Sequence, residues 1–299
     1  MSSFVSRRSR RNLIGASSIL FGVLSAGVAP SLSVRAAASA PPNFSPDSIV
    51  GWIAVPGGFK PPSSGPGPIA NDPAHPVAVN LLPNYPPSGR IQGPQPTFPV
   101  ADLNNPILQP WAREELRKRN ERILSGGTGF SRQASCWPIG VPGFLLHGVQ
   151  PVYFIQTAKE VIMVWQEDYQ TRRIYLNVPH SAHVTPSWFG ESVGHYEGDT
   201  LVVDTVGMND KTWIDNFRTP HTDKLHVIER YRIIDGGKTL EVNVHVEDPG
   251  AFTTPWNAIQ RYTHAEFGPM IEVSCAEGML NDYFHLDAEP IPQADKPDF

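Results

Sequence analysis

Charged residues and cysteines are scarce in this sequence of 299 residues. Charged side chains make up 18% of it, and the net charge of −5 provides no basic surface of the kind that binds nucleic acid. It has no phosphate-binding loop or dinucleotide fingerprint, so we expect no nucleotide cofactor. Beyond residue 40 the chain has no apolar run of about 18 residues, so we expect no membrane span in the mature protein.

A serine nucleophile elbow is also excluded. The segment Gly190–Gly194 has the glycine and serine spacing of that motif. It leads into a predicted strand, however, whereas the motif requires a helix after the serine. The sequence therefore indicates no serine hydrolase of that type.

The two cysteines are Cys136 and Cys275. In an oxidising compartment we expect them to form a disulfide, which would stabilise the fold by roughly 4–5 kcal/mol in the chain-entropy model. The alternative is two separate buried thiols. Neither cysteine has a histidine or a helix start beside it, which argues against a nucleophilic role.

The N-terminus has the features of an export signal. Arg10 and Arg11 precede a moderately apolar run, residues 13–28, and small residues follow at 36–40. The pattern resembles a twin-arginine (Tat) signal. We expect the Tat export machinery as a partner, cleavage near residues 37–41, and a periplasmic or secreted bacterial protein. The alternative, an uncleaved membrane anchor, requires a longer and less interrupted apolar run.

Proline and glycine are abundant, with 31 and 25 residues, and favour a turn-rich all-β chain. Residues 41–100 show neither helical nor strand periodicity. We interpret them as an irregular arm that either wraps the domain or is mobile, with Trp52 and Ile53 as a docking point. Residues 101–299 are expected to form a single β-rich domain. A helix is predicted over 110–124, because Pro110 suits a first helical position and a glycine pair follows the segment.

One hairpin, residues 225–248, has a pattern that predicts both of its strands and the register in which they pair. Both arms alternate apolar and polar residues around Gly236-Gly237, which predicts a two-residue turn. In this register Arg232 lies opposite Glu241, a favourable cross-strand pair. Glu229 then stands in the apolar row, opposite Val244.

The chain after residue 150 indicates a β-barrel. Short strands follow one another through tight turns, which predicts an antiparallel meander that closes into a lipocalin-like or calycin-like barrel of about eight or nine strands. A two-sheet sandwich is the alternative. The predicted strands are 152–156, 161–166, 173–178, 191–196, 201–206, 226–234, 239–247, 257–264 and 271–275.

The stretch from Trp188 to Thr205, WFGESVGHYEGDTLVVDT, is followed by Pro220-His221, Glu229-Arg230-Tyr231 and Trp256. Over residues 136–278 this pattern resembles a large group of exported bacterial proteins. The resemblance supports the domain boundaries and implies no particular reaction.

Two carboxylates are candidate catalytic groups. Glu229 lies in an apolar row, where burial would raise its pKa toward the range for proton transfer. A structural carboxylate bonded to a buried arginine is the alternative interpretation. Asp204 lies between Val202 and Val206, and the register of its hairpin leaves its face open.

Histidines form a second group of candidates. His180 and His221 each follow a proline, with His183 and His226 nearby in sequence. If these loops met at one barrel mouth, His180, His183 and His221 could bind a transition metal or transfer protons. Loop and surface histidines are the alternative, and the pairing of His226 with Glu247 already explains His226.

Aromatic residues could form the walls of a ligand site. The loop 207–224 is long for a hairpin connection and contains Trp213. Aromatic residues at sheet ends also close cores, so both interpretations stay open. The predicted substrate-binding residues are Tyr231, Trp188, Trp213 and Trp256.

The leading hypothesis is an exported enzyme, a lyase, isomerase or cyclase, that acts on a small apolar or aromatic molecule inside the barrel. Proton transfer would need no cofactor, with Glu229 as acid or base, His221 or His180 as its partner, and Asp204 as a further candidate. A non-catalytic periplasmic ligand-binding protein is the first alternative. The second is an oxygenase or hydrolase with one transition metal ion on His180, His183 and His221.

Overall fold

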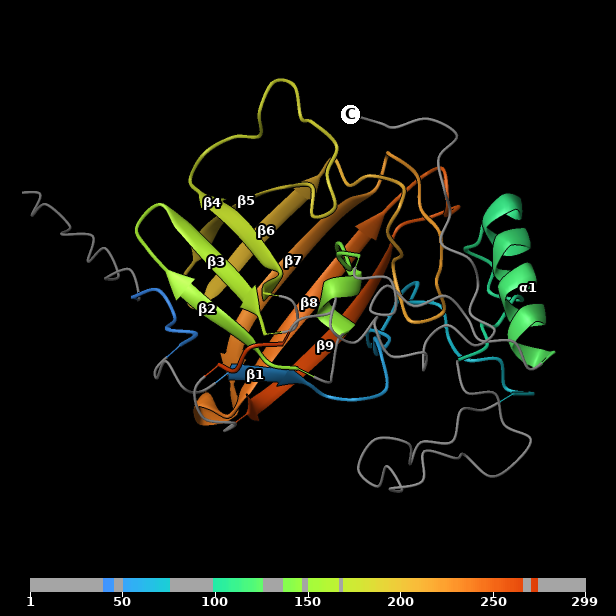
Figure 1. The fold of residues 1–299 in the computed structure, drawn as a ribbon, viewed down its shortest axis with the longest axis horizontal. Coiled ribbons are helices and arrows are strands. Elements are labelled where there is room, and N and C mark those ends of the chain that lie inside the picture. The colour runs from blue at the N-terminus through green and yellow to red at the C-terminus, as the bar shows by residue number, and fades with distance from the viewer. Residues whose placement is uncertain are drawn as a thin grey trace, which may run out of the picture. The chain divides into compact units, whose positions relative to one another are not determined.

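Nine strands close into a barrel in the computed structural model of this protein, among the residues it describes: 40–45, 51–75, 99–125, 137–146, 150–166, 169–265 and 270–273 (Figure 1). The predicted all-β barrel with one helix is therefore confirmed. The strands pair in chain order, and the first also pairs with the last. They are β1 (Gly51–Ala54), β2 (Val152–Gln156), β3 (Glu160–Trp165), β4 (Thr171–Leu176), β5 (Glu191–Glu197), β6 (Thr200–Val206), β7 (His226–Ile234), β8 (Thr239–Glu247) and β9 (Trp256–Ala265).

The β7–β8 hairpin has the predicted register, with Glu229 opposite Val244 and Arg232 opposite Glu241. The turn differs from the prediction. The last pair is Ile234 with Thr239, so four residues connect the strands instead of two. Asp235 already has a positive φ of 54°, and Gly236 follows at 64°. The chain therefore leaves the ladder one residue earlier than a two-residue turn would allow.

Strand β1 lies within the segment predicted to be an irregular arm. It pairs with β9 along its whole length and with β2 through Trp52. The Trp52 indole is buried and donates a hydrogen bond of 2.7 Å to the carbonyl of Phe44. Phe44 packs on Phe154 with ring centroids 5.1 Å apart. These described parts of the arm therefore complete the barrel.

Strands β4 and β5 run parallel, unlike the predicted antiparallel meander, with Ile174 opposite Ser192 and Leu176 opposite Gly194. Parallel neighbours need a connection of roughly a dozen residues, because the chain must return to the same end of the sheet. Residues 177–190, the β4–β5 loop, supply that connection. In Figure 1 this loop arches above β4 and β5.

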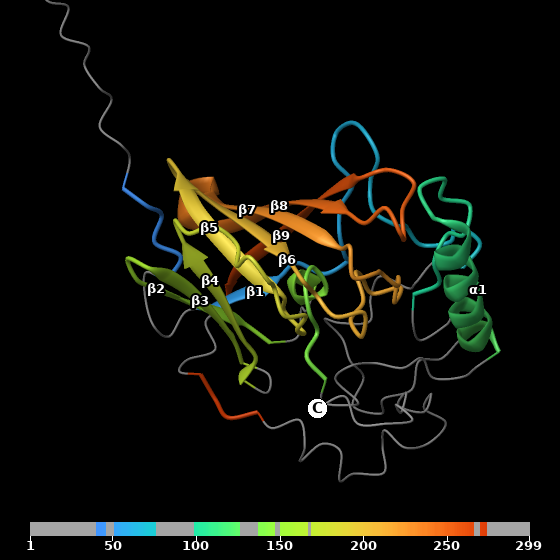
Figure 2. The same ribbon diagram turned by 90° about the horizontal axis from the view of Figure 1, so that it is seen from above.

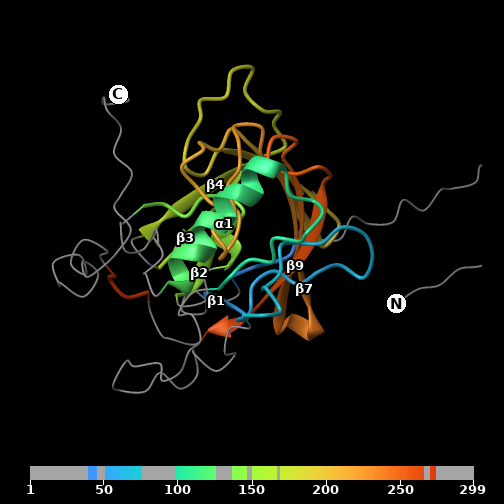
Figure 3. The same cartoon turned by 90° about the vertical axis from the view of Figure 1, so that its right-hand side faces the viewer.

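The helix α1 (Pro110–Leu124) has the predicted bounds. It lies beside one end of the barrel, next to the loops that follow β6 and β8 (Figures 2 and 3). Arg119 donates a hydrogen bond to the carbonyl of Arg218 in one loop. Gln109, the residue before the helix, donates its N–H to the carbonyl of Ala251 in the other loop over 2.9 Å. Within the described part of the chain, no helix is long and apolar enough to cross a membrane.

Candidate functional site

Glu229 lies inside the barrel and is fully buried. The Arg172 guanidinium on β4 donates hydrogen bonds to both of its carboxylate oxygens, with 2.9 Å between Nη1 and Oε1. Tyr231, two residues along β7, donates its hydroxyl to Oε1 over 2.8 Å. The carboxylate is thus paired with a buried arginine, the structural alternative that the sequence left open.

All five N–H donors of Arg172 have acceptors. Besides Glu229 and the Tyr231 oxygen, they reach the hydroxyls of Ser192 and Thr205, 3.2 and 2.9 Å away. Burial by itself lowers the pKa of the Arg172 guanidinium, but the charge of Glu229 and the hydrogen bonds to Glu229 and Tyr231 together outweigh burial and hold that pKa above its usual value. This saturated network holds Arg172 charged in the core.

Tyr231 belongs to the same network. Burial, together with the Glu229 charge, raises the pKa of its hydroxyl well above the usual value, so the hydroxyl stays protonated. Its ring packs against Phe154 and Phe44, with centroids 6.2 and 6.5 Å away. Tyr231 therefore fills the barrel interior and does not line the site that we describe below.

Trp256 and Trp213 have structural contacts. The Trp256 ring is fully buried between Phe252 and Phe59, with centroids 5.8 and 6.0 Å away. Trp213 lies under the Arg119 guanidinium of α1, 5.6 Å from its ring centroid. Both tryptophans thus have packing contacts, and neither lines the groove described below.

His221 is 4% exposed. Its Nε2 lies 2.7 Å from the Thr212 hydroxyl, and its Nδ1 lies 2.9 Å from the carbonyl of Thr222. Both partners of His221 lie in the loop between β6 and β7, so these contacts hold two parts of that loop together. The described contacts of Glu229 come from β4 and β7, so the structure does not bring His221 to it as the predicted acid–base partner.

His180 and Asp204 do come together, on the outer face of the barrel. The Nε2 of His180 lies 3.0 Å from Oδ1 of Asp204, and its Nδ1 lies 3.0 Å from Oε1 of Glu191. Glu191 also accepts the Ser181 amide, over 2.7 Å, and the Ser181 hydroxyl. The Ser181 bonds, followed by the His180 bond, lower the pKa of the Glu191 carboxyl below its usual 4.5, although burial opposes the shift. Glu191 is therefore ionised near neutral pH.

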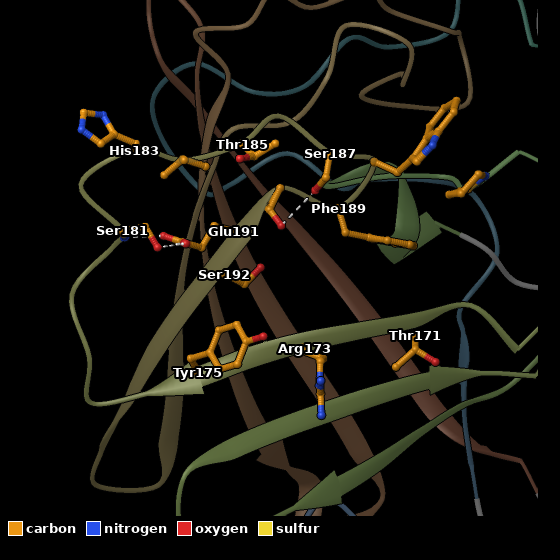
Figure 4. Close-up of a pocket in the computed structure, with 14 residues that line it drawn as sticks. Thr171, Arg173, Tyr175, Ser181, His183, Thr185, Ser187, Phe189, Glu191 and Ser192 are labelled. Atoms are coloured by element: carbon orange, nitrogen blue, oxygen red, sulfur yellow. Dashed lines mark hydrogen bonds between the residues drawn. The ribbon is translucent and has the colours of Figure 1, made fainter. Parts of the chain in front are cut away.

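A groove of about 530 Å³ lies beside this cluster, between the outer face of β4 and the β4–β5 loop (Figure 4). Thr171, Arg173 and Tyr175 project into it from β4, because alternate residues of a strand share a face. Arg173 also pairs with Glu160, 3.2 Å away. The opposite wall consists of Ser181, His183, Val184, Thr185, Ser187, Trp188 and Phe189.

Backbone contacts hold that wall in place. Ser187 donates its N–H to the carbonyl of Gly207 over 3.0 Å and accepts the N–H of Asn209 over 2.8 Å. Gly190 ends the loop at a φ of 63°, and a Cβ there would come within 2.4 Å of the Val206 carbonyl. Only glycine allows the backbone to come this close to Val206, so Gly190 determines where the loop meets the barrel.

Trp188 and Phe189 anchor the loop through ring contacts. Trp188 packs on Trp137, with centroids 5.3 Å apart, and Phe189 on Phe144, 5.9 Å apart. Trp188 is thus the predicted wall residue that the structure places in a groove.

Sequence reasoning missed Glu191, Arg173 and Tyr175 as site residues. Period-2 alternation in β4 places Arg173 and Tyr175 on one face, opposite to Ile174, and could have identified them. The same alternation places Arg172 inward with Ile174. The predicted strand began at 173, so this buried partner of Glu229 was overlooked.

The three histidines predicted to bind a metal lie in different surroundings. His183 is exposed in the groove wall, His180 lies between two carboxylates, and His221 is buried in its loop. In the part of the chain that the structure describes, no three or more His, Cys, Asp or Glu residues are grouped to hold a metal ion. Cys136 and Cys275 lie outside the described residues, as does the predicted export signal.

Comparison of the chain with protein-family models, curated proteins and solved structures gives no match.

Proposed function

We propose that this protein is an exported binding protein that takes up a small molecule with an aromatic or apolar ring. The ligand would lie in the groove between β4 and the β4–β5 loop, outside the barrel. The observation that carries the proposal is the groove itself, whose volume of about 530 Å³ lies in the range of small-molecule sites. Export rests on the twin-arginine pattern of the sequence.

The lining suits a ring with polar substituents. Tyr175 is 43% exposed, so its face is available for stacking, and Trp188 and Phe189 line the opposite wall. Hydroxyls of Thr185 and Tyr175 provide donors and acceptors for substituents on the ring.

The charges around the groove favour binding over proton transfer. Arg173 is paired with Glu160, and Glu191 accepts hydrogen bonds from His180 and Ser181. A carboxyl whose pKa lies below its usual value is a weak base. Inside the barrel, Arg172 and Tyr231 both donate hydrogen bonds to the Glu229 carboxylate. These contacts give no support to the acid–base role predicted for Glu229.

A second candidate function is proton-transfer catalysis by the His180 and Asp204 cluster beside the groove. Asp204 and His180 favour it, because an imidazole 3.0 Å from a carboxylate is a common general-base arrangement. Once a ligand is known, conversion that Asp204→Asn removes without loss of binding would identify the protein as an enzyme. Binding without conversion would support the carrier.

The Tyr175→Ala variant tests the groove. We expect it to weaken ligand binding about tenfold, because aromatic anchors often contribute more than about 1 kcal/mol. Ligand-observed NMR with a panel of indoles, phenols and benzoates would first identify a binder, and titration would then compare wild type with the variant.

Ile155→Ala is the matched control. Ile155 is an exposed apolar residue, 52% exposed, on β2 and outside the groove lining. Its loss should leave the affinity unchanged. Equal affinity of wild type and Tyr175→Ala for every binder found would refute the groove as the site.

A further inference from the structure

Most hydroxyl groups that line the groove already have hydrogen-bond partners in the chain. Three of them donate their proton to the protein itself: Thr171 to the carbonyl of Tyr169 over 3.0 Å, Ser181 to Glu191, and Ser187 to the carbonyl of Gly190 over 3.3 Å. Ser192 is buried, and its oxygen accepts a 3.2 Å bond from Arg172. The groups that are left to donate to a ligand are therefore others.

Arg173 carries the most hydrogen-bond donors that remain available in the groove. A guanidinium has five N–H groups. The Nε of Arg173 lies 3.2 Å from Oε2 of Glu160, and one N–H of Nη2 faces Oε1 over 3.5 Å. The other three N–H groups, two on Nη1 and one on Nη2, have no partner among the residues that the structure describes.

The pairing with Glu160 orients Arg173 without covering it. Glu160 meets the side of the guanidinium that includes Nε, and the Arg173 side chain remains 56% exposed. The two terminal nitrogens therefore form an open edge. A carboxylate fits this edge with two parallel hydrogen bonds, the geometry that arginine prefers for such groups.

Glu191 is the carboxylate of the groove lining, and its oxygens are already in use. Oε1 accepts the Ser181 N–H over 2.7 Å and lies 3.0 Å from Nδ1 of His180, and Oε2 accepts the Ser181 hydroxyl. Figure 4 shows the Glu191 side chain directed toward Ser181 and away from Arg173. The loop thus supplies the partners of Glu191, which leaves Arg173 as the charged group that a ligand meets.

Neutral donors and an aromatic face accompany Arg173. Tyr175 follows it by two residues on β4, so both side chains enter the groove from the same face. Thr185 and the exposed His183 lie in the opposite wall, as does Trp188. In the described part of the chain, the polar groups of Tyr175, Thr185 and His183 have no hydrogen-bond partner. The groove therefore offers donors beside a ring-stacking surface.

We propose that the groove selects ring compounds that carry a carboxylate, and that Arg173 determines this specificity. The carboxylate would accept two parallel N–H bonds from the terminal nitrogens of Arg173 while the ring stacks on Tyr175. This inference names the class of ligand and rests on the proposed function for the existence of a ring site.

Titration with matched probes tests the selectivity for charge. Benzoate and phenylacetate are the carboxylates, and benzamide and phenylacetamide are their neutral counterparts of similar shape. Near neutral pH we expect wild type to bind each carboxylate about tenfold more tightly than its amide, since hydrogen bonds to charged groups are stronger than neutral ones. Added salt should weaken carboxylate binding and leave amide binding unchanged, because it screens exposed charges.

Variants of Arg173 assign the selectivity to this residue. Arg173→Met keeps an unbranched apolar side chain, and it should weaken carboxylate binding about tenfold with little effect on the amides. It also leaves Glu160 unpaired, so the double variant Arg173→Met, Glu160→Gln is required and should show the same loss. Glu160→Gln alone should bind carboxylates at least as tightly as wild type. Arg173→Lys should retain only part of the selectivity, because an ammonium group cannot form the two parallel bonds.

Arg230→Met is the matched control. Arg230 is 45% exposed and pairs with Glu197, so its surroundings resemble those of Arg173, but it lies outside the groove lining. This variant should bind all four probes as wild type does.

Equal affinity of wild type for carboxylates and amides would overturn the inference and leave the ring site of the proposed function in place. Undiminished carboxylate binding in the double variant would have the same meaning. If neither the carboxylates nor the amides bound, the proposed function itself would be refuted, and the selectivity inferred for the groove would fall with it.

Discussion

Glu229→Gln is expected to lower the free energy of unfolding by about 3–5 kcal/mol, because it leaves the Arg172 guanidinium charged in the core without a counter-ion. Arg172 is 1% exposed and Glu229 fully buried, so solvent does not screen the lost charge. Glutamine keeps the shape and one acceptor for Tyr231, which isolates the effect of charge. Urea unfolding followed by fluorescence measures the change.

Glu160→Gln is the matched control. It makes the same chemical change in the pair of Glu160 with Arg173, whose side chain is 56% exposed. Such surface pairs contribute at most about 1 kcal/mol. Similar effects of the two substitutions would contradict the buried network. The double variant Arg172→Met, Glu229→Leu should recover most of the stability, because a buried ion pair can often be replaced by apolar residues of similar volume.

Trp52→Ala is expected to cost about 3–5 kcal/mol, the usual effect of removing a large buried aromatic side chain. The Trp52 ring is 1% exposed, and its loss also leaves the Phe44 carbonyl without its indole donor. The short strand β1 depends on this residue, because Trp52 is also where β1 pairs with β2. Thermal and urea unfolding measure the loss.

Trp111→Ala on α1 serves as the comparison, since the Trp111 side chain is 41% exposed. Its removal should change the unfolding free energy by no more than about 1 kcal/mol. If the two tryptophan variants were equally stable, β1 would not be a structural part of the barrel.

The parts of the fold that sequence could predict are those with local signals. The β7–β8 register follows from period-2 alternation around Gly236-Gly237, since a slip by one residue would turn the apolar rows outward. The α1 bounds follow from Pro110 and the glycines after the segment. Both signals lie within the element that they specify.

Strand β1 lacks such a signal. Gly51–Ala54 is too short to show a period, and its partners are on β9, at the far end of the chain. The direction of β5 relative to β4 is not encoded in alternation either, which is the same for parallel and antiparallel strands. The length of the β4–β5 loop was the available signal.

The candidate site could be predicted only in part. His180 and Asp204 were identified by residue type, but their contact depends on how the loop crosses β5 and β6. Glu229 was recognised as an unusual residue in an apolar row. Its role depended on Arg172, which lies on a strand more than fifty residues away.

The pairing of β1 with β9 determines when the barrel can close. Trp52 pairs with His264, so these partners lie about 200 residues apart in the chain. During synthesis β1 emerges before β9 and remains without this partner until β9 has been made. Folds that depend on such distant pairings form in milliseconds to seconds. The barrel therefore cannot close until β9 has been synthesised.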